Sequence, residues 1–390
     1  MPTGLLDAHD YGFPVPIAYG PGRFAEIADH CARYGIMRPL IVTDRGSKDL
    51  PFIGRLVELL GAAGLTNAVF SDISPNPRDD EIEAGCAALR EGDHDAVIGI
   101  GGGSAMDGGK AVCLKAHNDI DLWDFDIETS APSMAGETPF PKLICVPTTS
   151  GTGAETESTA MVTDTVKGMK FCVWHPELKP SVALLDPELT LGLPPNLTAW
   201  TGADALTHAI EAYTVPVLNP LCDGMALEAL SLISTWLEVA AQDPDNLEAR
   251  GGMLLGSCLA GISFIKGLGH VHAISHMVGA EFDTQHGLTN AIVLPVVLRY
   301  NLPGLPEKTQ RMAEAMGLGA LRADQFCSHV SGILDRLDIP KGLHALDVDM
   351  ASAERLASKA LLDAAAGTNP RQSDQAEMQA LIEEAITGAR

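Results

Sequence analysis

Short, continuous runs of apolar residues recur along the first half of the chain. They lie at residues 39–44, 67–72, 96–104, 142–147 and 181–186. Amphipathic helical patterns at 22–34 and 78–91 alternate with these runs. Continuous apolar runs are typical of strands buried on both faces, and strands separated by helices predict a parallel α/β sheet. The segment 13–20 reads as an extended edge segment, because its prolines cannot donate hydrogen bonds within a central strand.

The pattern changes near Pro194, where β-branched runs give way to long amphipathic stretches. These stretches lie at residues 196–213, 220–241, 246–265, 290–300, 308–316, 324–337, 351–364 and 374–388. Their apolar positions recur with the period of an α-helix, which predicts an all-helical second half. We therefore predict two domains: an α/β domain with a parallel sheet at 1–195, followed by an all-α domain at 196–390.

Composition and charge exclude several classes of protein. The 390 residues suffice for two domains of ordinary size, and no apolar run approaches the ~20 residues that a membrane-spanning helix needs. The first residues lack the basic and apolar regions of a secretion signal, and eight cysteines without a CxxC pair indicate reduced thiols. A net charge of −25 repels nucleic acid and anionic lipid. We expect a cytoplasmic globular protein with neither a nucleic-acid nor a membrane partner.

Four histidines lie within residues 267–287, and two of them are spaced to share one face of a helix. Further upstream, an aspartate and a histidine are also four residues apart. Neutral imidazole and carboxylate both bind divalent transition metals. The candidate ligands are Asp204, His208, His272, His276 and His286. Each pair alone is more often an ordinary core or surface pair than a ligand pair, so spacing leaves both interpretations open.

The stretches GADALTHAIEAY and GLGHVHAISHMVGAEFDTQHGLTNAIVLPVVLRYN resemble the iron-containing alcohol dehydrogenase family. The resemblance extends from about Gly20 to the NPR at Asn369–Arg371. It implies an NAD-binding α/β domain and an all-α metal-binding domain, the plan shared with dehydroquinate synthase. It also implies that the metal is held by Asp204, His208, His272 and His286. His276 matches a family histidine that lies near the metal without binding it, which implies a catalytic role as a proton relay.

The family implies Fe(II) as the metal, although three histidines and one carboxylate also suit Zn(II). His270 stands where the family more often has an apolar residue, and we expect it to be solvated or to cap a helix.

Two glycine-rich loops, IGIGGGSAMD and PTTSGTGAE, follow predicted strands. The dinucleotide fingerprint GxGxxG is absent, because Ser104 occupies its last position. Even so, glycines let a diphosphate approach the backbone, and Ser104 is expected to N-cap a helix whose free N–H groups attract phosphate, with Asp107 completing a capping box. A tight strand-to-helix turn is an equally good interpretation of the residues. The resemblance identifies both loops as NAD-binding segments.

The positions expected to contact NAD are Asp44, Asn76, Gly101, Gly102, Gly103, Ser104, Asp107, Thr148, Thr149, Ser150, Thr152 and Lys170. A carboxylate at Asp44, after a strand, can accept both ribose hydroxyls of NAD and would repel the 2′-phosphate of NADP. Its alternative role is to cap a loop. Glu157 departs from the family, which often has a cofactor-contacting threonine there, so that role does not carry over.

These residues predict an NAD-dependent alcohol dehydrogenase acting on a short primary alcohol, with a divalent ion as Lewis acid. Polyols and hydroxy acids are alternative substrates within the family. A lyase similar to 3-dehydroquinate synthase is less favoured, because that enzyme has a glutamate where this chain has Asp204. A non-catalytic protein with a structural metal would not need two nucleotide loops. We also expect a homodimer, or a multiple of dimers, formed by edge pairing of residues 13–20.

Overall fold

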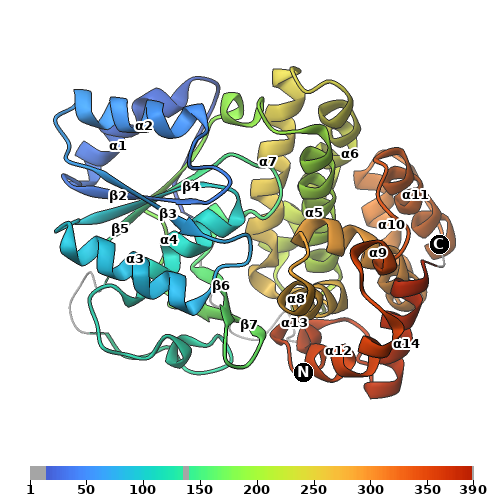
Figure 1. The fold of residues 1–390 in the computed structure, drawn as a ribbon. Helices are drawn as coiled ribbons and strands as arrows, with labels where there is room; N and C mark the ends of the chain where they lie inside the picture. The colour runs from blue at the N-terminus through green and yellow to red at the C-terminus, as the bar shows by residue number, and fades with distance from the viewer. Residues whose placement is uncertain (1–14, 135–139, 389–390) are drawn as a thin grey trace. The chain divides into compact units, whose positions relative to one another are not determined.

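The computed structural model describes residues 15–134 and 140–388. Within them the chain forms two compact units (Figure 1). Residues 15–149 and 154–192 form an α/β unit, whereas residues 150–153 and 193–388 form a helical unit. The helical unit thus includes a four-residue segment from the first half of the chain, which no hydrophobic pattern indicates.

A six-stranded, all-parallel sheet organises the α/β unit, in the order β1-β8-β5-β4-β2-β3. Its strands are β1 (Ile17–Tyr19), β2 (Pro39–Asp44), β3 (Ala68–Ile73), β4 (Ala96–Gly101), β5 (Lys142–Pro147) and β8 (Val182–Leu185). The predicted parallel sheet is confirmed, and β1 lies at its edge. Residues 13 and 14 of the predicted edge segment lie outside the described residues. An antiparallel hairpin of β6 (Thr159–Asp164) and β7 (Met169–Trp174) was not predicted.

Apolar side chains cover both faces of the sheet, which explains the continuous apolar runs. On one face, Ile41, Ile98 and Ile144 pack with residues of the helices α1 (Ile27–Tyr34) and α2 (Pro51–Ala62). On the other face, alternate strand residues pack with α3 (Asp79–Glu91) and α4 (Gly103–Lys115) (Figure 1). The neighbouring strands β4 and β5 pair along their full length, so their carboxyl ends lie side by side, where Gly101 pairs with Pro147.

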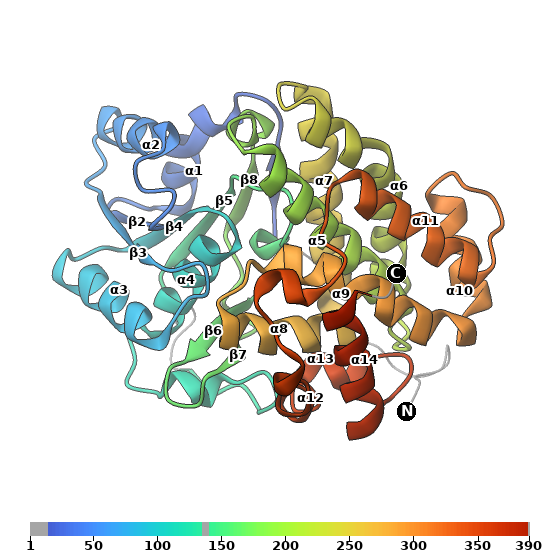
Figure 2. The same cartoon turned by 45° about the vertical axis from the view of Figure 1, so that its right-hand side comes forward.

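The helical unit contains ten α-helices within the described residues. They are α5 (Pro195–Thr214), α6 (Pro220–Gln242), α7 (Leu247–Ser263), α8 (His270–Phe282), α9 (His286–Asn301), α10 (Pro306–Ala315), α11 (Ala323–Arg336), α12 (Ala353–Ala360), α13 (Ala364–Thr368) and α14 (Gln375–Thr387). Helices α8 and α9 pack against one another, and α9 packs on α5 (Figure 2). The predicted all-helical half is confirmed.

Two predicted helix boundaries in this unit are wrong. The stretch 351–364 is broken into α12 and α13, because Asp363 leaves the helix and its Oδ1 accepts a hydrogen bond from Ala365 N at 2.9 Å. The helix predicted at 290–300 begins earlier, at His286, where the side chain of Gln285 caps it by accepting from Leu288 N. The earlier start places His286 on a helix terminus rather than in a loop.

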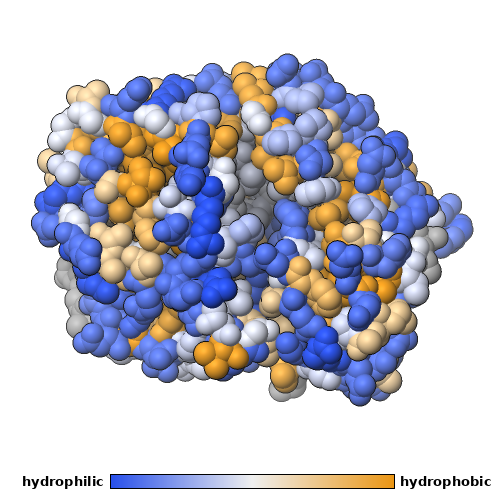
Figure 3. Space-filling model, in the orientation of Figure 1, coloured by the Kyte–Doolittle hydropathy of each residue, from blue (hydrophilic) through white to orange (hydrophobic). Residues whose placement is uncertain are grey.

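By length and composition alone, α6 could cross a membrane, and so could residues 247–266 and 270–282 if this pair, bent by 102°, were one span. No such segment was expected from the sequence, because no apolar run approaches ~20 residues. Helix α6 packs closely on α7 here: a Cβ at Gly252 would lie 2.2 Å from Trp236 Cδ1, and one at Gly256 would lie 2.9 Å from Ile233 Cγ1. Core helices of globular proteins share this composition. One face of the molecule is mostly hydrophilic, with apolar side chains in separate patches (Figure 3).

Candidate metal centre and nucleotide loops

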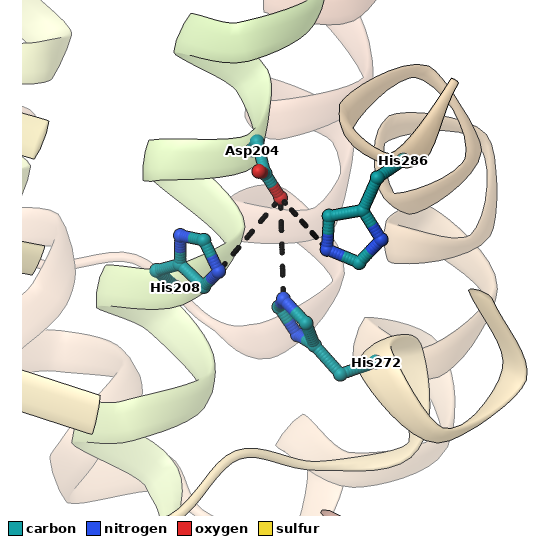
Figure 4. A group of neighbouring side chains, drawn as sticks. All are labelled: Asp204, His208, His272 and His286. Atoms are coloured by element: carbon teal, nitrogen blue, oxygen red, sulfur yellow. Dashed lines mark ion pairs between the residues drawn. The ribbon is translucent and has the colours of Figure 1, made fainter. Parts of the chain in front are cut away.

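The four side chains expected to bind metal come together in the helical unit (Figure 4). Asp204 and His208 lie one turn apart on α5, His272 lies on α8, and His286 is the first residue of α9. One ligand atom from each residue lies within 4.8 Å of the others. Asp204 Oδ1 is 3.9 Å from the Nε2 atom of each histidine. Ligand atoms lie ~2.0–2.2 Å from a bound zinc ion, so this spacing leaves room for an ion between them.

Hydrogen bonds on the far side of two rings direct their Nε2 atoms into the cluster. His208 Nδ1 lies 3.3 Å from Gly151 O, and His272 Nδ1 lies 2.5 Å from Glu211 Oε2. Glu211 Oε1 also accepts a hydrogen bond from Val271 N at the start of α8. When an acceptor holds Nδ1–H, the lone pair of the imidazole is on Nε2, the arrangement common in metal sites.

The charges of the cluster also suit a cation. Burial lowers the pKa of His208 to about 4 and that of His272 to about 3, so both rings are neutral at pH 7. Asp204 is buried, and the ion-pair partners found for it within the described residues are histidines. A buried carboxylate among neutral imidazoles is costly without a positive charge. The donor set therefore fits a divalent transition metal.

His276 lies beside the cluster and outside it. Its Nδ1 is 2.9 Å from Asp363 Oδ2, and its ring stacks on that of His286 with centroids 5.5 Å apart and an angle of 15°. The contact with Asp363 leaves Nε2 as the nitrogen available for a substrate. Sequence reasoning missed Asp363, because it lies 87 residues from His276 and carries no local signal.

The first glycine-rich loop places backbone against the start of α4. Gly101 has φ +142°, and a Cβ there would lie 2.7 Å from Ala105 Cβ and 2.9 Å from Asp44 Oδ2, so only glycine fits. Gly102 is the N-cap of α4 and no side chain caps this helix. The prediction that Ser104 is the N-cap is wrong, because the helix begins at Gly103. Uncapped N–H groups at the start of a helix are able to bind an anion such as a diphosphate.

Asp107 does not complete a capping box. Its Oδ2 accepts from Met161 N at 3.2 Å, and its Oδ1 lies 3.2 Å from Lys110 Nζ. Lys110 is completely buried, donates to a backbone oxygen, Ala154 O, at 2.8 Å, and lies 3.9 Å from Glu157. Burial raises the pKa of Glu157 to about 7. Glu157, which departs from the family pattern, thus faces the ammonium group of Lys110. The i,i+3 spacing of Asp107 and Lys110 could have indicated their own pairing, but not the contact with Glu157.

The second loop lies next to the first within the α/β unit. Thr148 N donates to Gly101 O at 2.9 Å, and Thr149 Cγ2 is 3.7 Å from where a Gly102 Cβ would be. Ser150 and Thr152 belong to the helical unit instead. The four hydroxyl residues of this loop that were expected to contact NAD are therefore divided between the two units.

Asp44 holds the turn that follows β2. Its Oδ1 accepts from Gly46 N at 2.9 Å and from Ser47 N at 3.0 Å, and its Oδ2 accepts from Ser47 Oγ at 2.8 Å. The loop-capping alternative is therefore present in the structure, while the same carboxylate faces Gly101 of the first glycine-rich loop.

Asn76 and Lys170 both adjoin the β6–β7 hairpin. Lys170 is paired across the hairpin with Thr163, whose N–H donates to Pro77 O at 2.7 Å. Asn76 precedes that proline, and both Asn76 and Lys170 are buried. The hairpin, which was not predicted, is what brings these two distant positions into one region of the α/β unit.

Two family descriptions match nearly the whole chain. "Iron-containing alcohol dehydrogenase" matches residues 14–187, and "Fe-containing alcohol dehydrogenase family, C-terminal" matches residues 198–386. The 1,3-propanediol dehydrogenase of Klebsiella pneumoniae is 36% identical over 97% of this chain and 98% of its own length. The 4-hydroxybutyrate dehydrogenase of Cupriavidus necator is 34% identical over 94% of this chain and 96% of its own.

Comparison with solved structures gives similar relatives. A 1,3-propanediol oxidoreductase superposes with a TM-score of 0.91 at 34% identity, covering 97% of this chain and all of that one. An alcohol dehydrogenase from Oenococcus oeni also gives a TM-score of 0.91, at 31% identity, over 97% of this chain and all of its own. These relatives are oxidoreductases, and they give no support to the lyase alternative.

Proposed function

Since this chain belongs to the iron-containing alcohol dehydrogenase family and is an alcohol dehydrogenase, we propose that it transfers hydride between a short primary alcohol and NAD. We propose further that the ligands of its divalent ion are Asp204, His208, His272 and His286. The observation that carries this proposal is the convergence of one carboxylate oxygen and three imidazole nitrogens within 4.8 Å. Fe(II) is the family's metal, and the same donors also suit Zn(II).

A bound divalent ion supplies Lewis acidity toward the alcohol oxygen. The protein's contribution is to hold the donors and to set their charge. A single carboxylate, that of Asp204, leaves the site with a net positive charge, which favours negative charge developing on the substrate oxygen. His276, held at Nδ1 by Asp363, is placed to exchange a proton through Nε2.

The α/β unit is the proposed NAD-binding part. The uncapped start of α4 and the close approach at Gly101 suit a diphosphate. Asp44 is proposed to favour NAD over NADP, because a carboxylate repels a 2′-phosphate. The remaining proposed contacts are those of Asn76, Gly102, Gly103, Ser104, Asp107, Thr148, Thr149, Ser150, Thr152 and Lys170.

An apolar side chain beside the cluster favours a short, uncharged substrate. The ring of Phe264 lies 4.8 Å from that of His208, centroid to centroid. Polyols and hydroxy acids are the second candidate class, because relatives are named for 1,3-propanediol and for 4-hydroxybutyrate. We further propose a cytoplasmic homodimer, or a multiple of dimers, in which the β1 edge of one copy pairs with that of another.

A metal-reconstitution assay tests this function. Chelator-stripped protein is reloaded with Fe(II) or Zn(II), and NAD reduction is followed with 1-propanol, 1,2-propanediol, 1,3-propanediol and 4-hydroxybutyrate. We expect no turnover after stripping, recovery on reloading, and NADH binding throughout, because the proposed dinucleotide contacts lie mostly in the other unit. Full activity in protein shown to be free of metal would refute the proposal, and the rank of the four substrates would assign the class.

A further inference from the structure

A fifth side chain reaches the metal cluster. Asn290 lies one turn after His286 on α9 and is completely buried. Its Nδ2 atom is 2.7 Å from Asp204 Oδ1, 3.0 Å from His272 Nε2 and 3.1 Å from His286 Nε2. One amide nitrogen therefore contacts three of the four atoms that are proposed to bind the ion.

These contacts counteract a repulsion within the cluster. Without a cation, the carboxylate of Asp204 and the Nε2 lone pairs of two neutral imidazoles face one another in a buried space. An amide nitrogen carries two N–H donors and no acceptor. Its two donors can therefore be shared among these three acceptors and keep them close, whereas a carboxylate oxygen or an imidazole lone pair has no proton to donate to the others.

The oxygen of the Asn290 amide indicates that contacts with the cluster determine how this side chain is oriented. Asn290 Oδ1 is buried and has no hydrogen-bond partner within the described part of the chain. An unpartnered buried carbonyl oxygen is unfavourable. The amide thus holds its position through Nδ2 and the ligand atoms, rather than through bonds made by its oxygen.

We infer that Asn290 is a positioning residue of the metal centre. It assembles Asp204, His272 and His286 before the ion arrives, so less ordering of the ligands remains when the ion binds. The inference rests on the proposed function only in requiring that this cluster bind a divalent ion. If Asn290 were instead a packing residue of α9, its loss would lower stability and leave ion affinity and coordination geometry unchanged.

The test is a Co(II) titration of the metal-stripped full-length protein, with Asn290→Leu as the variant. Leucine has a similar shape and removes the donor. The matched control is Thr289→Val on the same helix, since its buried hydroxyl donates to Thr284 Oγ1 at 2.8 Å and to Gln285 O at 2.9 Å, away from the ligand atoms of the cluster. Co(II) absorbs visible light according to its coordination geometry, so one titration reports both affinity and arrangement.

We expect Asn290→Leu to weaken Co(II) binding by about 10–100-fold, the range typical of residues that orient metal ligands, and to change the Co(II) spectrum. The control should keep the wild-type Kd and spectrum while its Tm falls. A wild-type Kd and spectrum in Asn290→Leu would overturn the inference, as would an equal loss of affinity in the control. If the leucine variant does not fold, Asn290→Ser, which shortens the side chain, should show the same weakening.

The wild-type protein separates this inference from the proposed function. Wild-type protein that binds no Co(II) would overturn both. Wild-type protein that binds Co(II) and is active with the reloaded metal, beside an Asn290→Leu variant of unchanged affinity, would overturn only the role of Asn290.

Discussion

Asp44 combines two roles that a pair of substitutions can separate. Its carboxylate accepts three hydrogen bonds from the turn after β2, and it is proposed to exclude the 2′-phosphate of NADP. Asp44→Gly removes all three hydrogen bonds, at about 1 kcal/mol each, so we expect the free energy of unfolding to fall by roughly 3 kcal/mol. Asp44→Asn keeps an oxygen for the N–H groups of Gly46 and Ser47 and loses mainly the charge, so a loss of only ~1 kcal/mol is expected.

The preference for NAD over NADP should depend on the negative charge at residue 44 rather than on the stability of the variant. The wild-type protein should prefer NAD to NADP by at least about tenfold in kcat/KM, or ~1.4 kcal/mol. Both variants should erode this preference, although Asp44→Gly should lose roughly 3 kcal/mol of stability and Asp44→Asn only ~1 kcal/mol. The measurements are kcat/KM with each cofactor and urea unfolding of each variant. Ser47→Ala is the control, because it removes one hydrogen bond of the turn and leaves the carboxylate in place.

Two results would refute this reasoning. Equal kcat/KM for NAD and NADP in the wild-type protein would show that Asp44 does not discriminate between them. A full preference for NAD in Asp44→Asn would show that the negative charge is irrelevant, and that Asp44 acts by shaping the turn alone.

Three further predictions concern the metal centre, pH and assembly. His286→Ala should lose metal and activity together, whereas His276→Ala should keep metal and lose about a hundredfold or more in rate; metal analysis showing the reverse pattern would exchange their roles. Burial lowers the pKa of His208 and of His270 to about 4 and that of His272 to about 3, so the unfolded chain binds protons below pH 6.5 that the metal-free fold excludes. Stability should therefore be complete above pH 6.5 and fall by about 1.4 kcal/mol per histidine at pH 5.5, roughly 4 kcal/mol in all; a flat pH profile of urea unfolding in chelator would contradict this. Light scattering at micromolar concentration should give a dimer or a multiple of dimers, and a clean monomer would exclude edge pairing through β1.

The sequence alone determined the features that depend on local periodicity. Continuous apolar runs predicted the parallel sheet, and amphipathic stretches predicted the helical half, because each pattern depends on which faces of a strand or helix are buried. The i,i+4 spacing of Asp204 and His208 likewise places both on one helix face, so these two residues could be named as candidate ligands without coordinates. The resemblance then singled out His272 and His286 from the other histidines.

Only the tertiary structure decided which groups support those ligands. Glu211 reaches His272 across 61 residues of sequence, Asp363 reaches His276 across 87, and Asn290 reaches Asp204 across 86. No local pattern marks such partners, because a hydrogen bond between distant segments depends on how helices pack rather than on their own periodicity. The start of α4 was also misplaced: Ser104 has the propensity of an N-cap, but the helix begins one residue before it, at Gly103, with Gly102 as its N-cap.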